Sequence, residues 1–281
     1  MPGAQELVTV LDLAGVRCAV DCSEPALWHR LGDRYAEFAT VGPADLLLTV
    51  EVVRRPPAAS RPRRGPYASV SVAGGRLTVA GADFQGVLDT ATGRGRIRQP
   101  LAAAPFETFL TAVCAWRLLE HGGFLLHAAG LKDAEGAVVF FGPSGAGKST
   151  VARLVGDGVI SDEVVAVTPT AAGYQVSGLP WRGRRWSAPL DALYALRQAA
   201  ETAFIPLRPA LGARALLSSV FFPSADRASV ARFLDTAAGV LAGVPCYEMR
   251  FAPDRSFWLR LPHRGRPAGA REEEGATRVA L

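Results

Sequence analysis

The sequence predicts an α/β (α+β) fold: a smaller α+β module followed by a domain built on a mixed sheet. The apolar run of residues 137–141 passes through a glycine-rich loop into helix-compatible residues 150–155, which gives a strand, a loop and a helix in direct succession. Short apolar runs bounded by glycine and proline recur in both halves of the chain, as expected for strands. With 281 residues, 49% of them hydrophobic, the chain can form one large domain or two modest ones.

Residues 1–120 are predicted to form the α+β module, which is a candidate for binding a substrate or a partner. Its strands are indicated by short apolar runs, and glycine-containing turns join them into hairpins. Its last helix is indicated by apolar residues at helical spacing that end before a glycine pair. The expected elements are a hairpin of residues 8–13 and 16–20, a helix over 25–35, a strand over 46–53, a hairpin of 68–72 and 77–79, and a helix over 106–120.

Residues 121–262 are predicted to form the second domain. Residues 263–281 are small, polar and charged, and are predicted to form a flexible tail. The domain begins with a hairpin whose second strand leads into the glycine-rich loop. The expected strands are residues 124–130, 137–141, 159–160, 164–167, 245–250 and 257–261, and the expected later helices are 189–199 and 228–241.

The glycine-rich loop has the pattern G-x-x-x-x-G-K-[ST], in which each residue type serves phosphate binding. Glycines permit close backbone approach, so that successive N–H groups can point at a phosphate. Lys148 supplies a positive charge for the β- and γ-phosphates, Ser149 supplies a hydroxyl for Mg²⁺, and the following helix directs its positive end at the anion. A chance glycine turn is the alternative, which the flanking strand and helix disfavour. The predicted ligands are ATP and Mg²⁺, bound by Gly142, Pro143, Ser144, Gly145, Ala146, Gly147, Lys148, Ser149 and Thr150.

An acidic pair follows the loop after an unusually short interval. Only a short helix and a turn separate Ser149 from a brief strand that ends in Ser161, Asp162 and Glu163. Upstream, His127 lies in the strand that precedes the loop strand. Alone, a histidine in an apolar strand is more often a hydrogen-bonded core residue than a catalytic one. Together, these residues indicate a phosphate site flanked by carboxylates.

The chain resembles the catalytic domain of the HPr kinase/phosphorylase family in the order of three segments, Leu126–Gly130, Phe141–Thr150 and Ile160–Glu163. That family is similar in fold to the nucleotide-binding part of phosphoenolpyruvate carboxykinase. The resemblance implies a kinase that phosphorylates a serine. It implies that Asp162 is the base and a Mg²⁺ ligand, that Ser149 also binds Mg²⁺, and that His127 and Lys148 assist. Glu163 stands where the family has a second aspartate, and we expect it to have a lesser role.

The resemblance covers about residues 120–260 and is tight only over residues 127–163. The family's Glu-x-Arg-Gly-x-Gly signature has no clear counterpart here, which argues against phosphorylase activity. The nearest segment, residues 178–185, contains Arg182, Arg184 and Arg185 and could clamp a phosphoryl group or form a solvated loop. Trp181 and Trp186 beside it are either core residues or a cover over the site.

Composition excludes several other classes. No apolar run approaches the ~18 residues of a membrane helix, and the N-terminus lacks a signal-peptide pattern, so a cytoplasmic protein without a membrane partner is expected. The net charge of +5 comes largely from a Pro/Arg-rich segment, residues 54–66, which lacks the aromatic residues of a nucleic-acid site. Cys18, Cys22, Cys114 and Cys246 have no zinc-site spacing and are expected to be ordinary thiols.

Two functions remain on the sequence alone. The first is an ATP-dependent kinase that acts on a hydroxyl, with a serine of a protein or peptide as the leading acceptor and free serine or another small metabolite as the alternative. The second is a nucleotide-binding regulatory protein without phosphotransfer. A positioned base is needed only for transfer, so the residues favour the kinase. An assembly of identical chains is an expectation by analogy with the family alone.

Overall fold

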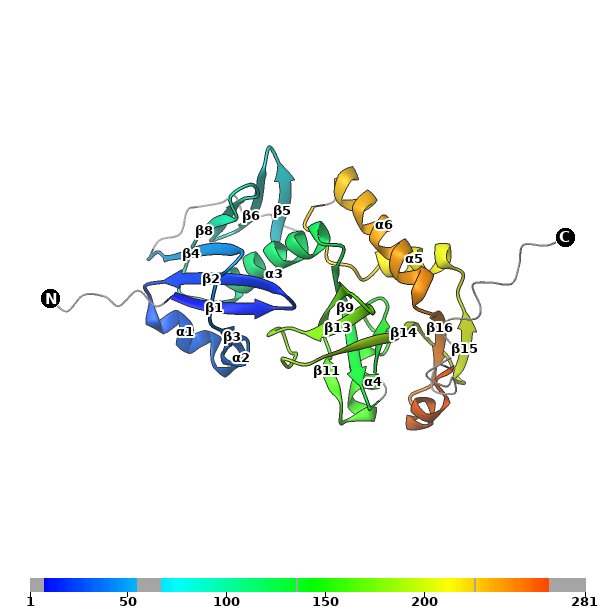
Figure 1. The fold of residues 1–281 in the computed structure, drawn as a ribbon. Coiled ribbons are helices and arrows are strands. Elements are labelled where there is room, and N and C mark those ends of the chain that lie inside the picture. The colour runs from blue at the N-terminus through cyan, green and yellow to red at the C-terminus, as the bar shows by residue number, and fades with distance from the viewer. Residues whose placement is uncertain (1–7, 55–66, 135, 225, 263–281) are drawn as a thin grey trace.

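The computed structural model describes residues 8–54, 67–134, 136–224 and 226–262 (Figure 1). The predicted tail and most of the Pro/Arg-rich segment lie outside these residues. The described chain has two mixed sheets with helices packed against them, which confirms the mixed α/β fold class. Within the described residues, no helix combines the length and apolar character needed to cross a membrane.

The N-terminal module is an eight-stranded sheet in the order β3-β1-β2-β4-β8-β7-β6-β5. Both predicted hairpins are present, whereas the strands β7 and β8 were not predicted from the sequence. The predicted helix over 25–35 is broken into two at Gly32, whose φ of 63° is incompatible with a continuing helix. The elements are β1 (Val8–Leu13), β2 (Val16–Cys22), α1 (Pro25–Leu31), α2 (Asp33–Ala36), β3 (Ala39–Thr40), β4 (Leu46–Val52), β5 (Ala68–Ala73), β6 (Arg76–Gly81), β7 (Gln85–Asp89) and β8 (Arg94–Gln99).

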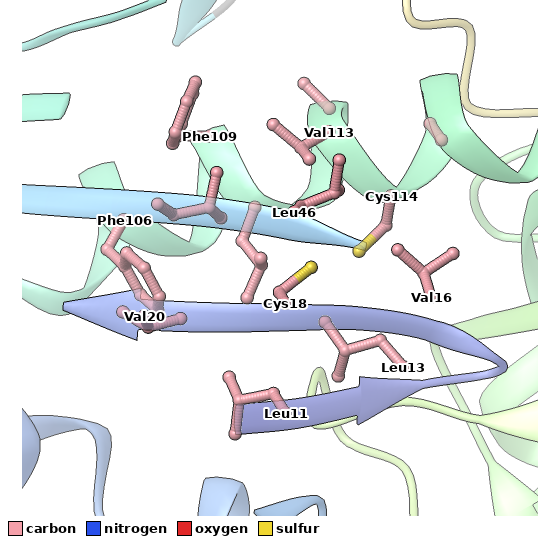
Figure 2. Close-up of a cluster of buried hydrophobic side chains, with 14 of the residues drawn as sticks. Leu11, Leu13, Val16, Cys18, Val20, Leu46, Phe106, Phe109, Val113 and Cys114 are labelled. Atoms are coloured by element: carbon pink, nitrogen blue, oxygen red, sulfur yellow. The ribbon is translucent and has the colours of Figure 1, made fainter. Parts of the chain in front are cut away.

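Helix α3 (Ala103–Glu120) covers the apolar face of this sheet and then leads into the second sheet (Figure 1). Its apolar residues recur at helical spacing, as predicted, and the strands alternate buried and partly exposed positions. Figure 2 shows Phe106, Phe109, Val113 and Cys114 of α3 with buried side chains of β1, β2 and β4. Removal of this apolar surface from water is the main stabilising contribution to the module.

The second sheet has the order β10-β9-β12-β13-β14-β16-β15, with β11 beside β9. β14 pairs with β13 at its start and with β10 and β16 at its end, so β10, β9, β12, β13 and β14 form a closed ring of strands. The elements are β9 (Phe124–Lys132), β10 (Ala137–Phe141), α4 (Lys148–Val155), β11 (Val159–Ser161), β12 (Val164–Thr170), β13 (Gly173–Gly178), β14 (Ser187–Gln198), β15 (Ala203–Pro206), α5 (Pro209–Leu217), α6 (Arg227–Gly243), β16 (Cys246–Phe251) and the 3₁₀ helix η1 (Arg255–Arg260).

Buried clusters cover both faces of the loop-bearing strand β10. Val139 and Phe141 face the cluster that contains α5 and α6, whereas Val138 and Phe140 face the cluster that contains α4 and η1. Both faces of β10 are therefore buried, which explains why its sequence is continuously apolar rather than alternating between apolar and polar residues.

Two predicted elements are wrong. The segment 189–199, predicted as a helix, is most of strand β14, because parallel β10 and β16 pair with its two edges. Its closely spaced apolar residues fit either period, and tertiary pairing decides between them. The segment 257–261, predicted as a strand, is mostly η1, which begins where the Asp254 side chain accepts a hydrogen bond from the Ser256 N–H.

The two modules share one apolar cluster. Leu125, Val164 and Trp181 of the second module belong to the same buried cluster as α3 and the N-terminal strands. Arg185 adds polar contacts across the boundary, donating hydrogen bonds to the carbonyl oxygens of Glu37 and Ala39. The predicted boundary near residue 120 therefore does not separate two independent cores.

Because of this shared cluster, we expect both modules to unfold in a single transition. Leu125→Ala should lower the free energy of unfolding by about 2–5 kcal/mol, the usual cost of truncating a fully buried leucine. Denaturant unfolding followed by circular dichroism and tryptophan fluorescence measures this. Leu259→Ala is the control, because Leu259 is 82% exposed and its loss should change the free energy by no more than about 0.5 kcal/mol. Two separate transitions in the wild type would contradict the shared core.

Candidate functional site

Strand β9 organises the candidate site through its backbone pairing. One edge of β9 pairs with β10 along residues 128–132. The opposite edge pairs with β12 along residues 124–127. The glycine-rich loop leaves the sheet after Phe141, which pairs with Ala128. The Ala128 N–H donates to the carbonyl oxygen of Glu163 at 3.0 Å. The start of the loop and the acidic pair therefore flank β9, two strand spacings or about 10 Å apart.

The predicted strand, loop and helix are present, although α4 already begins at Lys148. Gly142, Gly145 and Gly147 have φ values of 145°, 81° and 113°, which side-chain-bearing residues rarely adopt. At Gly147, a Cβ would also lie 2.9 Å from the ring of Phe251 on β16. The loop therefore favours glycine at the two motif positions, 142 and 147, and also at position 145, which the motif leaves open.

The Lys148 side chain folds back on the loop. Its Nζ donates to the carbonyl oxygens of Gly142 at 2.7 Å and of Pro143 at 3.1 Å, and the residue is only 6% exposed. Burial lowers the pKa of the Lys148 ammonium below its ordinary value. Pro143, Ser144 and Ser149 are exposed, so the outer side of the loop is open to a ligand.

Two residues that the sequence analysis missed also hold the loop. The Gly142 N–H donates to Ser219 Oγ at 3.1 Å, and Gln198 Nε2 donates to the carbonyl oxygen of Gly145 at 2.6 Å. Ser219 follows α5 and is 77 residues from Gly142. No sequence signal could have identified Ser219, whereas a correct assignment of β14 would have placed Gln198 at the strand end beside the loop.

A single arginine, Arg182, contacts both members of the acidic pair. Arg182 donates from Nη2 to Asp162 Oδ2 at 2.7 Å, and its Nη1 lies 3.4 Å from Glu163 Oε2. The Arg182 backbone has a φ of 63° and its loop is tied to β11, since the Arg184 N–H donates to the Ile160 carbonyl oxygen. Because the Asp162 side chain is 21% exposed and that of Glu163 is 42% exposed, Asp162 is the more enclosed carboxylate.

His127 lies between the loop and the acidic pair along β9. It pairs with Val164 of β12, directly after the acidic pair, and its ring packs edge-on against Phe221 with centroids 6.3 Å apart. Burial lowers the pKa of His127 below 6.5, and the nearby Lys148 charge lowers it further, whereas Glu163 opposes the shift through its charge and a backbone hydrogen bond. The neutral imidazole is therefore favoured at neutral pH in this state.

The arginine segment divides into three different roles. Of its three arginines, only Arg182 contacts the acidic pair in the described structure, and the clamp on a phosphoryl group stays a prediction. Arg184 and Lys132 lie over the Trp186 ring, with their charged groups 4.9 and 4.5 Å from its centroid. Arg185 contacts the N-terminal module, and Trp181 is a core residue rather than a cover over the site.

Asp162 and Ser149 carry the side-chain oxygens that could share a magnesium ion with a ligand. Among the described residues, no cluster of three His, Cys, Asp or Glu side chains is arranged to hold a metal by itself. Mg²⁺ is usually held by one or two carboxylates together with substrate phosphates and water, and Asp162 with Ser149 supplies oxygen ligands of that kind. The four cysteines are free and buried, as predicted.

No protein-family model matches the sequence, and no curated protein matches it either.

The lowered pKa of His127 makes stability depend on pH in a defined direction. Below about pH 6.5, the unfolded chain takes up a proton at this position before the folded chain does, so acidification removes stability. We expect the wild type to lose more unfolding free energy than His127→Gln when the pH is lowered from about 8 to about 5. NMR titration of the His127 Cε1–H resonance, assigned by its absence in the variant, should give a pKa below 6.5. A value at or above 6.5 would contradict the burial argument.

Proposed function

We propose that this protein is a kinase that transfers the γ-phosphate of ATP to a hydroxyl group, with a serine of a protein or peptide as its acceptor. The observation that carries this proposal is a pair of backbone contacts made by Ala128 of β9. Ala128 pairs with Phe141 at the start of the glycine-rich loop and donates a hydrogen bond to Glu163 of the acidic pair. A protein that only binds nucleotide needs the loop but needs no carboxylate held beside it. The resemblance to the HPr kinase family, read from the sequence, leads to the same reaction.

In the proposed reaction, the loop N–H groups and Lys148 bind the phosphates, while Asp162 accepts the proton of the acceptor hydroxyl as the phosphoryl group is transferred in line. Ser149 and Asp162 would hold Mg²⁺ together with the phosphates, and the ion would supply positive charge at the transferring group. Before ligands bind, Arg182 orients the Asp162 carboxylate through the 2.7 Å contact between Nη2 and Oδ2. Glu163, more exposed and farther from Arg182, has the lesser role.

His127 acts in this scheme as a neutral group. Its lowered pKa argues against a role as an imidazolium cation that neutralises the Asp162 carboxylate. A neutral imidazole can still orient a carboxylate or the acceptor hydroxyl by a hydrogen bond. We therefore assign His127 to orientation, and the positive charge to Lys148, Arg182 and Mg²⁺.

The test is phosphotransfer from Mg·ATP, followed by mass spectrometry of candidate serine-containing peptides, proteins and small hydroxyl metabolites, free serine included. Asp162→Asn should reduce transfer by about 10²–10⁴-fold, the usual contribution of a general base, while binding of the nucleotide without Mg²⁺, measured by calorimetry, remains. Glu163→Gln is the matched comparison and should lose less activity than Asp162→Asn. Equal activity of Asp162→Asn and the wild type would overturn the assignment of the base.

Lysine offers a second matched pair, because Lys148 and Lys132 are the only lysines in the chain. Lys148→Ala should abolish transfer and weaken nucleotide binding, whereas Lys132→Ala should retain both, since Lys132 stacks on Trp186. Nucleotide binding by the wild type without any phosphorylated product would instead support the second function, a regulatory protein that binds nucleotide.

A further inference from the structure

The connection between α5 and α6 supplies part of the candidate site. Its residues 219–221 lie beside β9 on the same edge as β10, beyond the point where β10 ends. Leu126 pairs with Val220, and the Phe221 N–H donates to the carbonyl oxygen of Leu125 at 3.0 Å. Since β12 occupies the other side of Leu126, this segment takes the place that a longer β10 would have filled.

Ser219 lies at the point where β10 gives way to this segment. Its carbonyl oxygen accepts a hydrogen bond from the His127 N–H at 2.7 Å, and its Oγ accepts one from the Gly142 N–H at 3.1 Å. One residue thus contacts both the first residue of the loop and the backbone of His127. Ser219 is 5% exposed, so water cannot readily replace its hydroxyl.

We propose that Ser219 is a positioning residue for nucleotide binding, acting through the Gly142 N–H to hold the start of the glycine-rich loop. This inference rests on the proposed function, since it concerns the same phosphate site. Gln198 also contacts the loop, but its side chain is exposed and water can replace its hydrogen bond at little cost. Of these two contacts, the buried one therefore matters more.

The Ser219 hydroxyl acts on the loop before a ligand binds. A buried N–H without a partner is unfavourable, so without the Ser219 hydroxyl the loop should shift until Gly142 reaches another acceptor. Only the molecules whose loop has not shifted would then bind phosphates. The measured affinity would equal the intrinsic affinity multiplied by the fraction of such molecules.

The experiment compares Ser219→Ala and Ser219→Thr with the wild type by two measurements. Hydrogen exchange without nucleotide should show the Gly142 amide exchanging at least about tenfold faster in Ser219→Ala. Calorimetric titration with Mg·ATP should show an affinity about tenfold weaker. Ser219→Thr keeps the hydroxyl and should restore both. Ser224→Ala is the control, because Ser224 is a buried serine of the same connection that interacts with Asp226 rather than with the loop.

If Ser219→Ala does not fold, Ser219→Cys replaces it, because a thiol fills the site but is a weak acceptor, and the same two changes are expected. Unchanged Mg·ATP affinity in the folded variant would overturn the inference, even if its melting temperature were lower, because a purely structural serine would give that result. Unchanged exchange at Gly142 would overturn it as well. Failure of the proposed function is a separate outcome, seen when the wild type itself binds no nucleotide.

Discussion

The need of β9 for hydrogen-bond partners on both edges is the constraint on which the rest of the site depends. This strand is buried along almost all of its length, so its N–H and C=O groups cannot turn to water. β10 serves one edge only as far as Ala128, and residues 219–221 serve the edge beyond that point. The glycine-rich loop leaves the sheet where these partners change. On the opposite edge β11 gives way to β12, and the acidic pair lies in that connection.

The features that the sequence predicted correctly are local ones. The strand, loop and helix around Lys148, the hairpins and the long helix α3 are each specified by neighbouring residues. The segment 189–199 shows the limit of this reasoning, because its apolar residues fit a helix until β10 and β16 are known to flank it. The Ser219 contact could not be predicted, since it joins residues 77 positions apart through a single hydroxyl.

The N-terminal module is linked to the site more closely than a separate partner-binding domain would be. Val164, the residue after Glu163, belongs to the cluster formed by α3 and the N-terminal strands. Trp181, the residue before Arg182, belongs to it as well. The acidic pair and the arginine that contacts it therefore adjoin a core that the N-terminal module completes.

The charges of the site are satisfied internally before any ligand is present. Lys148 bonds to two carbonyl oxygens of its own loop, and Arg182 bonds to Asp162 and approaches Glu163. In the proposed reaction both contacts must change, because the phosphates need Lys148 and Mg²⁺ needs an oxygen of Asp162. A free nucleotide would engage Lys148 but leave Arg182 on the carboxylates, whereas free Mg²⁺ would have to compete with the guanidinium. Mg²⁺ and nucleotide together supply a cation for Asp162 and an anion for Arg182, so the two ligands should bind cooperatively.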